Sequence, residues 1–351
     1  MKKAIKITKV LLLSLFALVL LILAAHAIGY FINNRTPKGG INESMYIDIN
    51  GTKQWINIYG ESKNNPVLLY LHGGPGSSTS EIDYAFTRQW ADIYTVVTWD
   101  QRNCGKSYDK SQNADKLTKA MLMKDAKELT EFLIEHLGVE KISILGHSWG
   151  SIYGANLVLD YPELYEALIG SGQLVDIVEN EKAFKTQALK WAKGDEETLE
   201  LIEKINPEKI SLESIEAKNK ILNKYGLSMM KDGSDYSLLA TILFNPNYSI
   251  KDWLSYFHRD RQSYLDFYKS DEFKAFSLKG RYDYQVPYIN INGDMDYQVN
   301  YKLAQDYYDD VNAPYKATYI MKNTSHGLME SKSKKFLYLL HKAHDEIYNR
   351  K

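Results

Sequence analysis

The amino-acid sequence predicts an α/β fold, in which a mostly parallel central sheet is flanked by helices and carries a helical insertion. Short continuous apolar runs, the pattern of strands buried on both faces, alternate along the chain with segments of helical periodicity. The alternation stops near residue 174 and resumes near residue 280, and the charged segment between them has a helical pattern. Alternating strands and helices build a parallel sheet, so the insertion is expected to form a cap above it.

The individual elements of the core follow in order. Apolar side chains recur at helical spacing between residues 115 and 137, and Gly138 is expected to end that helix. One strand is predicted to begin at residue 44, and the other strands are predicted at 52–60, 67–71, 94–99, 141–145, 167–170, 287–292 and 315–321. Further helices are predicted to begin at about Trp149, to span 301–309 and to begin at about residue 333. We therefore expect residues 44–173 and 280–351 to form the core and residues 174–279 to form the cap.

The N-terminal region has the pattern of a membrane-spanning helix. Residues 1–9 form a short basic segment, and residues 10–32 have His26 as their only strongly polar side chain. A helix of these 23 residues, rising by about 1.5 Å per residue, is long enough to cross a hydrocarbon layer of about 30 Å. A signal peptide cleaved after Ala27 is the alternative, but the apolar run continues beyond that point. We expect a retained transmembrane anchor followed by a polar linker at 33–43.

The charges beside this span predict its orientation. Four lysines precede it, whereas only Arg35 and Lys38 follow it closely. Positive residues favour the cytoplasmic side, so the chain is expected to be a single-pass protein of the cell membrane with an extracytoplasmic body. The lipid bilayer would then be a partner, and cleavage after Ala27 would instead release a secreted body.

Composition excludes several other classes of protein. Hydrophobic residues make up 44% and charged residues 25% of the 351 positions, which is typical of a globular chain. Because five of the 43 basic residues lie in positions 1–35, the remaining 38 face 44 acidic ones, and nucleic acid is not expected as a partner. Cys104 is the only cysteine, which excludes an intramolecular disulfide and a cysteine-based zinc site. No metal or organic cofactor is expected.

The pentapeptide GHSWG at 146–150 fits the G-x-S-x-G pattern of a nucleophilic serine. It directly follows a predicted strand and precedes a predicted helix, and its glycines allow the tight turn that projects the Ser148 side chain above a sheet. A helix N-terminus that is merely capped by this serine is the alternative. We predict that Ser148 is the catalytic nucleophile, because the pattern occurs in the structural context that the chemistry needs.

A nucleophilic serine of this kind needs an orienting acid and a histidine base, which follow it along the chain in that order. His326 is the expected base, since it lies in the loop between the last predicted strand and the last helix. Asp296 is the expected acid, with Asp294 as the alternative, because GDMD directly follows the strand at 287–292. Asp283 precedes that strand and is therefore expected at the wrong end of the sheet.

The oxyanion that forms during catalysis needs backbone N–H donors. The N–H of Trp149, just after the nucleophile, is one expected donor. The other should come from the segment HGGPG at 72–76, which follows the strand at 67–71. Gly74 is preferred and Gly73 is possible, because a residue without a Cβ atom lets the backbone approach the substrate.

Together these motifs resemble the α/β-hydrolase superfamily, and within it the proline iminopeptidase-like serine hydrolases. Asn103 stands where that family usually has glycine, and asparagine tolerates left-handed backbone angles better than most residues. The family's paired Trp-Glu signature is missing, since Trp191 is followed by Ala192, so the resemblance does not define the substrate. It also implies that Cys104 is a packing residue. The resemblance covers roughly residues 44–345, through HGGPG at 72–76, DQRNCGKS at 100–107, GHSWG at 146–150, GDMD at 293–296 and SHG at 325–327.

The resemblance implies an aminopeptidase or amidase that acts on short peptides through an acyl-enzyme intermediate. A carboxylesterase or lipase-like hydrolase of small esters would use the same residues, and a non-catalytic recognition protein is a third hypothesis. An aminopeptidase must bind a free N-terminal ammonium, which needs carboxylates near the acyl pocket. Glu179 and Glu181, at the start of the cap, are the candidates, although acids at a helix start also favour the helix dipole.

Overall fold

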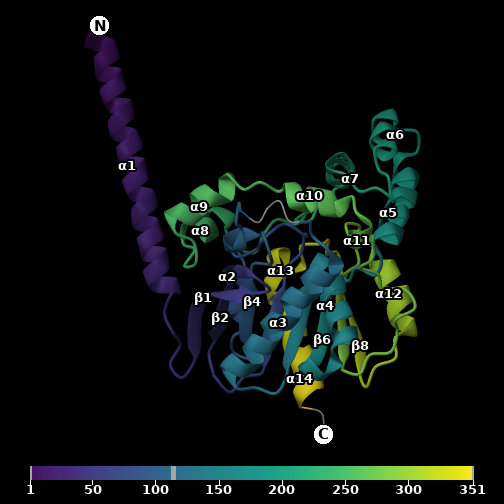
Figure 1. Cartoon of the computed structure of the whole chain (residues 1–351). Helices are drawn as coiled ribbons and strands as arrows, with labels where there is room; N and C mark the ends of the chain where they lie inside the picture. The colour runs from purple at the N-terminus through teal and green to yellow at the C-terminus, as the bar shows by residue number, and fades with distance from the viewer. Residues whose placement is uncertain (1, 112–115, 350–351) are drawn as a thin grey trace.

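The computed structural model describes residues 2–111 and 116–349 and is built around an eight-stranded sheet (Figure 1). The strands are β1 (Ile41–Ile49), β2 (Thr52–Gly60), β3 (Val67–Leu71), β4 (Thr95–Trp99), β5 (Ile142–His147), β6 (Tyr165–Ser171), β7 (Tyr288–Gly293) and β8 (Lys316–Met321). Their order across the sheet is β1-β2-β4-β3-β5-β6-β7-β8. The pairs β1–β2 and β2–β4 are antiparallel, and the remaining neighbours pair in parallel. The predicted mostly parallel sheet is therefore confirmed.

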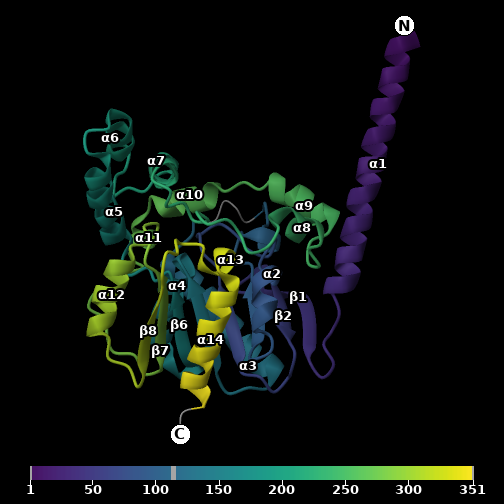
Figure 2. The ribbon, with the colours of Figure 1, turned by 180° about the vertical axis from the view of Figure 1, so that it is seen from behind.

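Helices cover both faces of this sheet. The core helices are α2 (Tyr84–Thr87), α3 (Lys119–Leu137), α4 (Trp149–Asp160), α12 (Tyr301–Asp310), α13 (Leu328–Ser331) and α14 (Ser333–Tyr348). Leu129 of α3 and Ile152 of α4 belong to the hydrophobic core on one face. Phe336 and Leu340 of α14 belong to the core on the other face, as the two opposite views show (Figures 1 and 2). Each face of the sheet is thus buried by its own helices, which explains why β3, β4, β5 and β7 are buried along their whole length.

Among the core elements, the predicted starts of α3 and β1 differ most from those of the structure. α3 begins at Lys119, where the side chain of Thr118 caps it, and residues 112–115 lie outside the described part of the chain. β1 begins at Ile41 instead of residue 44, because its backbone already pairs there with Gly60 of β2. The polar linker is accordingly shorter than the predicted 33–43.

The segment between β6 and β7 forms the predicted helical cap. Its helices are α5 (Ile177–Ala192), α6 (Glu196–Glu203), α7 (Leu212–Lys224), α8 (Leu238–Leu243), α9 (Ile250–Phe257), α10 (Gln262–Tyr268) and α11 (Asp271–Lys274). They lie along one edge of the sheet in both views (Figures 1 and 2). Phe184 of α5 and Ile221 of α7 belong to a separate hydrophobic cluster. This part of the cap therefore has a core of its own.

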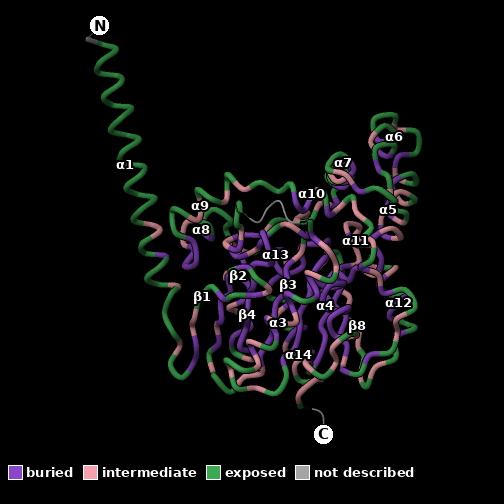
Figure 3. Tube along the Cα trace, in the orientation of Figure 1, coloured by how far each residue is buried: buried purple, intermediate pink, exposed green. Residues whose placement is uncertain are grey.

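A long helix, α1 (Lys2–Asn33), projects from the rest of the chain (Figure 1). Its most apolar 18-residue window has a mean hydropathy of 2.8, and none of that window is buried (Figure 3). The predicted basic and apolar segments thus lie on one continuous helix from Lys2 onward. Its length and composition allow it to cross a membrane, either as an anchor or as a signal sequence.

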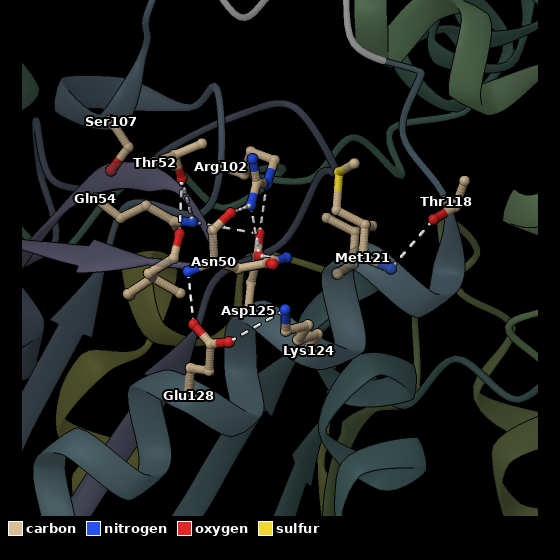
Figure 4. A network of polar contacts seen from close by, with 12 residues as sticks. Asn50, Thr52, Gln54, Arg102, Ser107, Thr118, Met121, Lys124, Asp125 and Glu128 are labelled. Carbon is tan, nitrogen blue, oxygen red and sulfur yellow. Dashed lines mark hydrogen bonds and ion pairs between the residues drawn. The ribbon is translucent and has the colours of Figure 1, made fainter.

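A buried ion pair joins the loop after β4 to α3 (Figure 4). Arg102 donates from Nε and Nη2 to the two carboxylate oxygens of Asp125, at 2.6 and 2.7 Å. Both side chains are at most 4% exposed. The side-chain amides of Asn50 and Gln54 donate to the same carboxylate at 2.8 and 3.3 Å. The network therefore holds the loop at 100–107 to the core of the molecule.

Replacing Asp125 with alanine should destabilise the protein by about 3 kcal/mol or more, because it removes the buried carboxylate that both of these Arg102 bonds reach. Urea unfolding followed by circular dichroism measures the change in the free energy of unfolding. Asp48→Ala is the matched control, since its ion pair with Lys53 is exposed and should contribute little. Equal stability of the two variants would show that the buried pair does not hold the loop.

Candidate active site

Ser148 lies in a tight turn between β5 and α4. Its backbone angles, φ 56° and ψ −121°, are strained for a residue with a side chain. The two glycines of the motif permit this turn. A Cβ atom on Gly146 would lie 2.2 Å from the Gly150 carbonyl oxygen, and one on Gly150 would lie 1.9 Å from the Leu71 carbonyl oxygen. The predicted serine turn is thus present, with the backbones of β3, β5 and α4 in direct contact.

His326 lies beside Asp296. His326 Nδ1 is 2.7 Å from Asp296 Oδ2, and the side chains are 5% and 0% exposed. The other carboxylate oxygen of Asp296 accepts from the Val299 N–H at 2.9 Å. Because Asp296 follows β7 and His326 follows β8, adjacent parallel strands deliver both groups to the same edge of the sheet.

The two alternative acids lie elsewhere. Asp294 pairs with Lys322 at 3.5 Å, and Asp283 accepts from the Asn312 side chain at 3.1 Å in an isolated backbone bridge before β7. The structure thus brings Asp296, and neither Asp294 nor Asp283, to His326. The turn after β7 folds back on itself, because the Asp296 N–H donates to the Gly293 carbonyl at 3.2 Å. The length of this turn explains why Asp296, and not Asp294, lies beside His326.

Two cavities meet at Ser148. The larger, of about 660 Å³, is also lined by Gly73, Gly74, His147 and His326. The smaller, of about 170 Å³, is lined by Gly74, Trp149 and residues of the cap. Ser148 therefore borders both cavities, and the candidate base His326 lines only the larger one.

The expected oxyanion donors lie around Ser148. Trp149 is the first residue of α4, so its N–H has no acceptor within the helix. A Cβ atom on Gly73 would lie 3.2 Å from the Ser148 Cβ atom, so a side chain at position 73 would crowd the serine. Gly74 lines both cavities, whereas Gly73 lines the larger. The glycine-rich segment thus lies against the serine, and its geometry does not distinguish Gly73 from Gly74 as the second oxyanion donor.

His72 holds this glycine-rich segment in place. Its Nδ1 is 2.7 Å from the Gly73 carbonyl oxygen, and its Nε2 accepts from the Gln101 N–H at 3.4 Å. Nδ1 therefore carries the proton and donates to the carbonyl. Burial lowers the pKa of His72 from 6.5 to about 4, although the bond to Gly73 opposes this change. A neutral His72 thus joins two of the motifs that surround the site.

The two predicted ammonium ligands are separated by the structure. Glu181 lines the smaller cavity, but its Oε1 is 2.6 Å from Lys218 Nζ. The Glu179 side chain instead forms ion pairs with Lys182 and Lys279 and is not among the residues lining either cavity. Residues two apart on a helix point in different directions, so one glutamate faces the cavity and the other faces away from it.

Sequence analysis missed Lys218 and Glu330. Lys218 is 3% exposed and also donates to the Gln298 carbonyl at 2.9 Å. Its position three and four residues before the buried Ile221 and Leu222 shows that it lies on the buried face of α7, a signal present in the sequence. Glu330 is buried on α13 and lines the larger cavity, and burial raises the pKa of its carboxyl group. Its spacing of four residues from His326 is the corresponding signal.

Comparison with known proteins defines the family. Residues 66–332 match the family model described as alpha/beta hydrolase fold. The chain therefore belongs to the α/β-hydrolase fold family, and the fold inferred from its motifs is confirmed. Membership of this family, together with relatives named as peptidases, supports a hydrolase.

Several relatives are named as peptidases. The chain is 27% identical over 289 residues to a probable aminopeptidase of Bacillus subtilis, covering 80% of this chain and 89% of that protein. It is 34% identical over 125 residues to a proline iminopeptidase of Lactobacillus helveticus, covering 35% of this chain and 41% of that protein. Its resemblance to proline iminopeptidase-like proteins is thereby confirmed.

Solved structures support the fold alone. A proline iminopeptidase-related protein of Thermus thermophilus aligns with a TM-score of 0.56 at 18% identity, covering 88% of this chain and 98% of the other. Naproxen esterase of Bacillus subtilis aligns with a TM-score of 0.56 at 16% identity, covering 91% and 97%. Proteins of different named activities are thus equally similar in structure, so the fold does not determine the substrate.

The low pKa of His72 predicts a loss of stability in acid. Between pH 6.5 and about 4, the unfolded chain binds a proton at His72 that the folded chain does not bind. The free energy of unfolding should therefore fall as the pH falls through this window, by up to about 1.4 kcal/mol per pH unit. His72→Asn should lose less stability than the wild type between pH 7 and pH 4.5 in urea unfolding. Identical pH profiles would contradict the assignment of a buried neutral His72.

Proposed function

We propose that this protein is a membrane-anchored serine hydrolase that cleaves short peptides, an aminopeptidase of the proline iminopeptidase type. One observation carries the hydrolase mechanism: His326, whose Nδ1 lies 2.7 Å from the buried Asp296 carboxylate, lines the same cavity as the strained Ser148. A serine, a histidine and a buried acid in this chain order are the groups that acyl transfer needs.

Each group has a definite part in the proposed reaction. With the Nδ1 proton directed to Asp296, Nε2 of His326 accepts the Ser148 hydroxyl proton as the Oγ atom attacks the scissile carbonyl carbon. The N–H groups of Trp149 and Gly74 stabilise the oxyanion. The imidazolium then protonates the leaving amine as the C–N bond breaks. Water hydrolyses the acyl-enzyme by the same steps, with His326 as base, and restores Ser148.

Glu181 is the proposed ligand for the substrate ammonium. The hydrogen bonds that Asn180 and Lys218 donate to its carboxylate both reach Oε1, at 3.1 and 2.6 Å. In this proposal the ammonium binds at Oε2, within the cavity that Ser148 and Gly74 also line. The names of the peptidase relatives support the same substrate class.

A carboxylesterase or lipase-like hydrolase is the second candidate, and one observation favours it. Lys218 neutralises the charge of Glu181, so this pair adds no net negative charge to the smaller cavity. A neutral acyl group would then fit as well as one that carries an ammonium. The two candidates share Ser148, His326 and Asp296 and differ only in the recognition of charge.

The proposed location is the cell membrane. None of the apolar window of α1 is buried, as expected for a helix that is in contact with lipid. The lysines before the span place the catalytic body on the extracytoplasmic side in this proposal. Removal of the helix after Ala27 would instead release the body from the membrane.

Ser148→Ala should lower kcat by about 10⁴–10⁶-fold and abolish labelling by a fluorophosphonate probe, since the three groups act as a unit. Asp296→Asn should also inactivate the enzyme, because it removes the carboxylate that orients His326. Asp294→Asn and Asp283→Asn are the matched controls, and both should retain activity. An inactive Asp294→Asn beside an active Asp296→Asn would overturn the proposed acid.

Unblocked prolyl or alanyl arylamides should react about 10- to 150-fold faster in kcat/KM than their N-acetyl forms, because the blocked substrates lose a charge-assisted contact. Glu181→Gln should erase most of this preference. Glu179→Gln should not, since Glu179 pairs with lysines outside the cavities. Hydrolysis of a neutral nitrophenyl ester checks that each variant folds. Equal rates for free and acetylated substrates would favour the esterase.

A further inference from the structure

The cap exposes an unusual number of large apolar side chains on α8 and α9. Phe257 is 75% exposed and Leu239 is 69% exposed. We call the whole group the apolar ridge; it consists of Leu238, Leu239, Ile242, Ile250, Leu254 and Phe257. Exposed apolar side chains that gather on two adjoining helices indicate an interaction site, because leaving them in water is unfavourable.

The exposure of the ridge does not result from a poorly packed helix. The indole ring of Trp253 lies 4.7 Å from the ring of the buried Tyr248, and Tyr256 lies 6.5 Å from it. The start of α9 is closed by a capping box between Ser249 and Asp252. α9 is thus held to the body by its aromatic face, while Ile250, Leu254 and Phe257, spaced as i, i+4 and i+7, point outward.

The ridge lies beside the end of α1. Gly29 packs against Phe244, the residue after α8, so closely that a Cβ atom on the glycine would lie 2.3 Å from the Phe244 Cα atom. Asn33 Nδ2 donates to the Phe244 carbonyl at 3.0 Å, and Arg88 donates to the Asn33 carbonyl. Both views show α8 and α9 next to the last turns of α1 (Figures 1 and 2). The ridge is therefore level with the part of α1 where a membrane span would end.

We propose that the apolar ridge docks on the lipid surface of the membrane that α1 spans. The inference depends on the anchor in the proposed function. An amphipathic helix binds in the interface plane, with its apolar face about 5–10 Å below the headgroups, and the position of α9 beside the end of α1 suits this depth. The exposed Lys251 on α9 adds a positive charge that anionic lipids attract.

Docking would also fix the position of the cavity beside Ser148 relative to the membrane surface. Asn245, just after α8, donates from its side chain to the Ser80 and Glu81 carbonyls, each at 2.9 Å. The adjoining residues Ser77, Ser78, Thr79 and Ile82 line the larger cavity beside Ser148. The ridge and this cavity wall are therefore parts of one hydrogen-bonded unit. With the ridge on the bilayer, amphipathic substrates gathered at the lipid surface would be close to the cavity.

A fluorescent label on the ridge tests this proposal in the full-length chain. The protein carries Phe257→Cys, labelled with an environment-sensitive nitrobenzoxadiazole dye, in vesicles of phosphatidylethanolamine and phosphatidylglycerol that contain nitroxide-labelled lipid. Cys104 does not interfere, because it is fully buried and burial raises the pKa of its thiol to about 12. Leu239→Cys gives a second label on α8. Glu140→Cys, exposed before β5 at the opposite end of the sheet, is the matched control.

The labels at 257 and 239 should be quenched at least about threefold more strongly than the label at 140, since they lie within the interface. Protein that resists a carbonate wash but shows equal quenching at the three positions would overturn the proposed docking of the ridge. The proposal that α1 is a membrane anchor would still stand. Protein that the carbonate wash removes would show that the anchor itself is wrong. If the dye instead becomes better protected from the nitroxide as the protein-to-lipid ratio increases, the ridge binds a second copy of the chain. That result would overturn the lipid proposal.

Discussion

The close contact between Gly150 and the Leu71 carbonyl oxygen is the constraint on which the candidate site depends. A side chain at this position would begin with a Cβ atom 1.9 Å from that oxygen, so any other residue would push α4 away from β3. Because α4 starts directly after Ser148, the contact also keeps the serine in its strained conformation, with φ of 56°. The packing of two central strands and a helix prevents this strained turn from relaxing. Ser148 therefore stays at the cavities.

The parallel sheet then assembles the remaining groups at the same edge. β3 leads into the glycine-rich segment, β5 into Ser148, β7 into Asp296 and β8 into His326. Strands that run in one direction end at one edge, so Ser148 and His326 line the same cavity although the whole cap lies between them in the chain. His72 joins the first of these loops to the loop at 100–107, and Arg102 anchors that second loop to α3. The site is therefore held by polar contacts that lie mostly outside the two cavities.

In the proposed function, the cap supplies the groups that recognise the substrate. Its α5 and α7 contribute Glu181 and Lys218, whose ion pair determines the charge of the smaller cavity. Its α8 and α9 contribute the apolar ridge, which faces away from the body beside the end of α1. In these proposals the two features would act on different properties of a substrate, since the ion pair would discriminate charge and the ridge would select molecules present at a lipid surface. An enzyme with both would act on amphipathic substrates close to the membrane from which it extends.

The sequence by itself determined the fold class and the chain order of the candidate groups, because both depend on local patterns: strand-length apolar runs, helical periodicity and the glycines around Ser148. Only the tertiary structure decided which carboxylate lies beside His326, since Asp294 and Asp296 follow the same strand and differ only in how the turn folds back. It also decided that Glu181 has a lysine partner 37 residues away. The spacing of Ile250, Leu254 and Phe257 would be the same on a helix that buries its apolar face. That α9 exposes this face follows from the packing of Trp253 against Tyr248, a contact that periodicity does not encode.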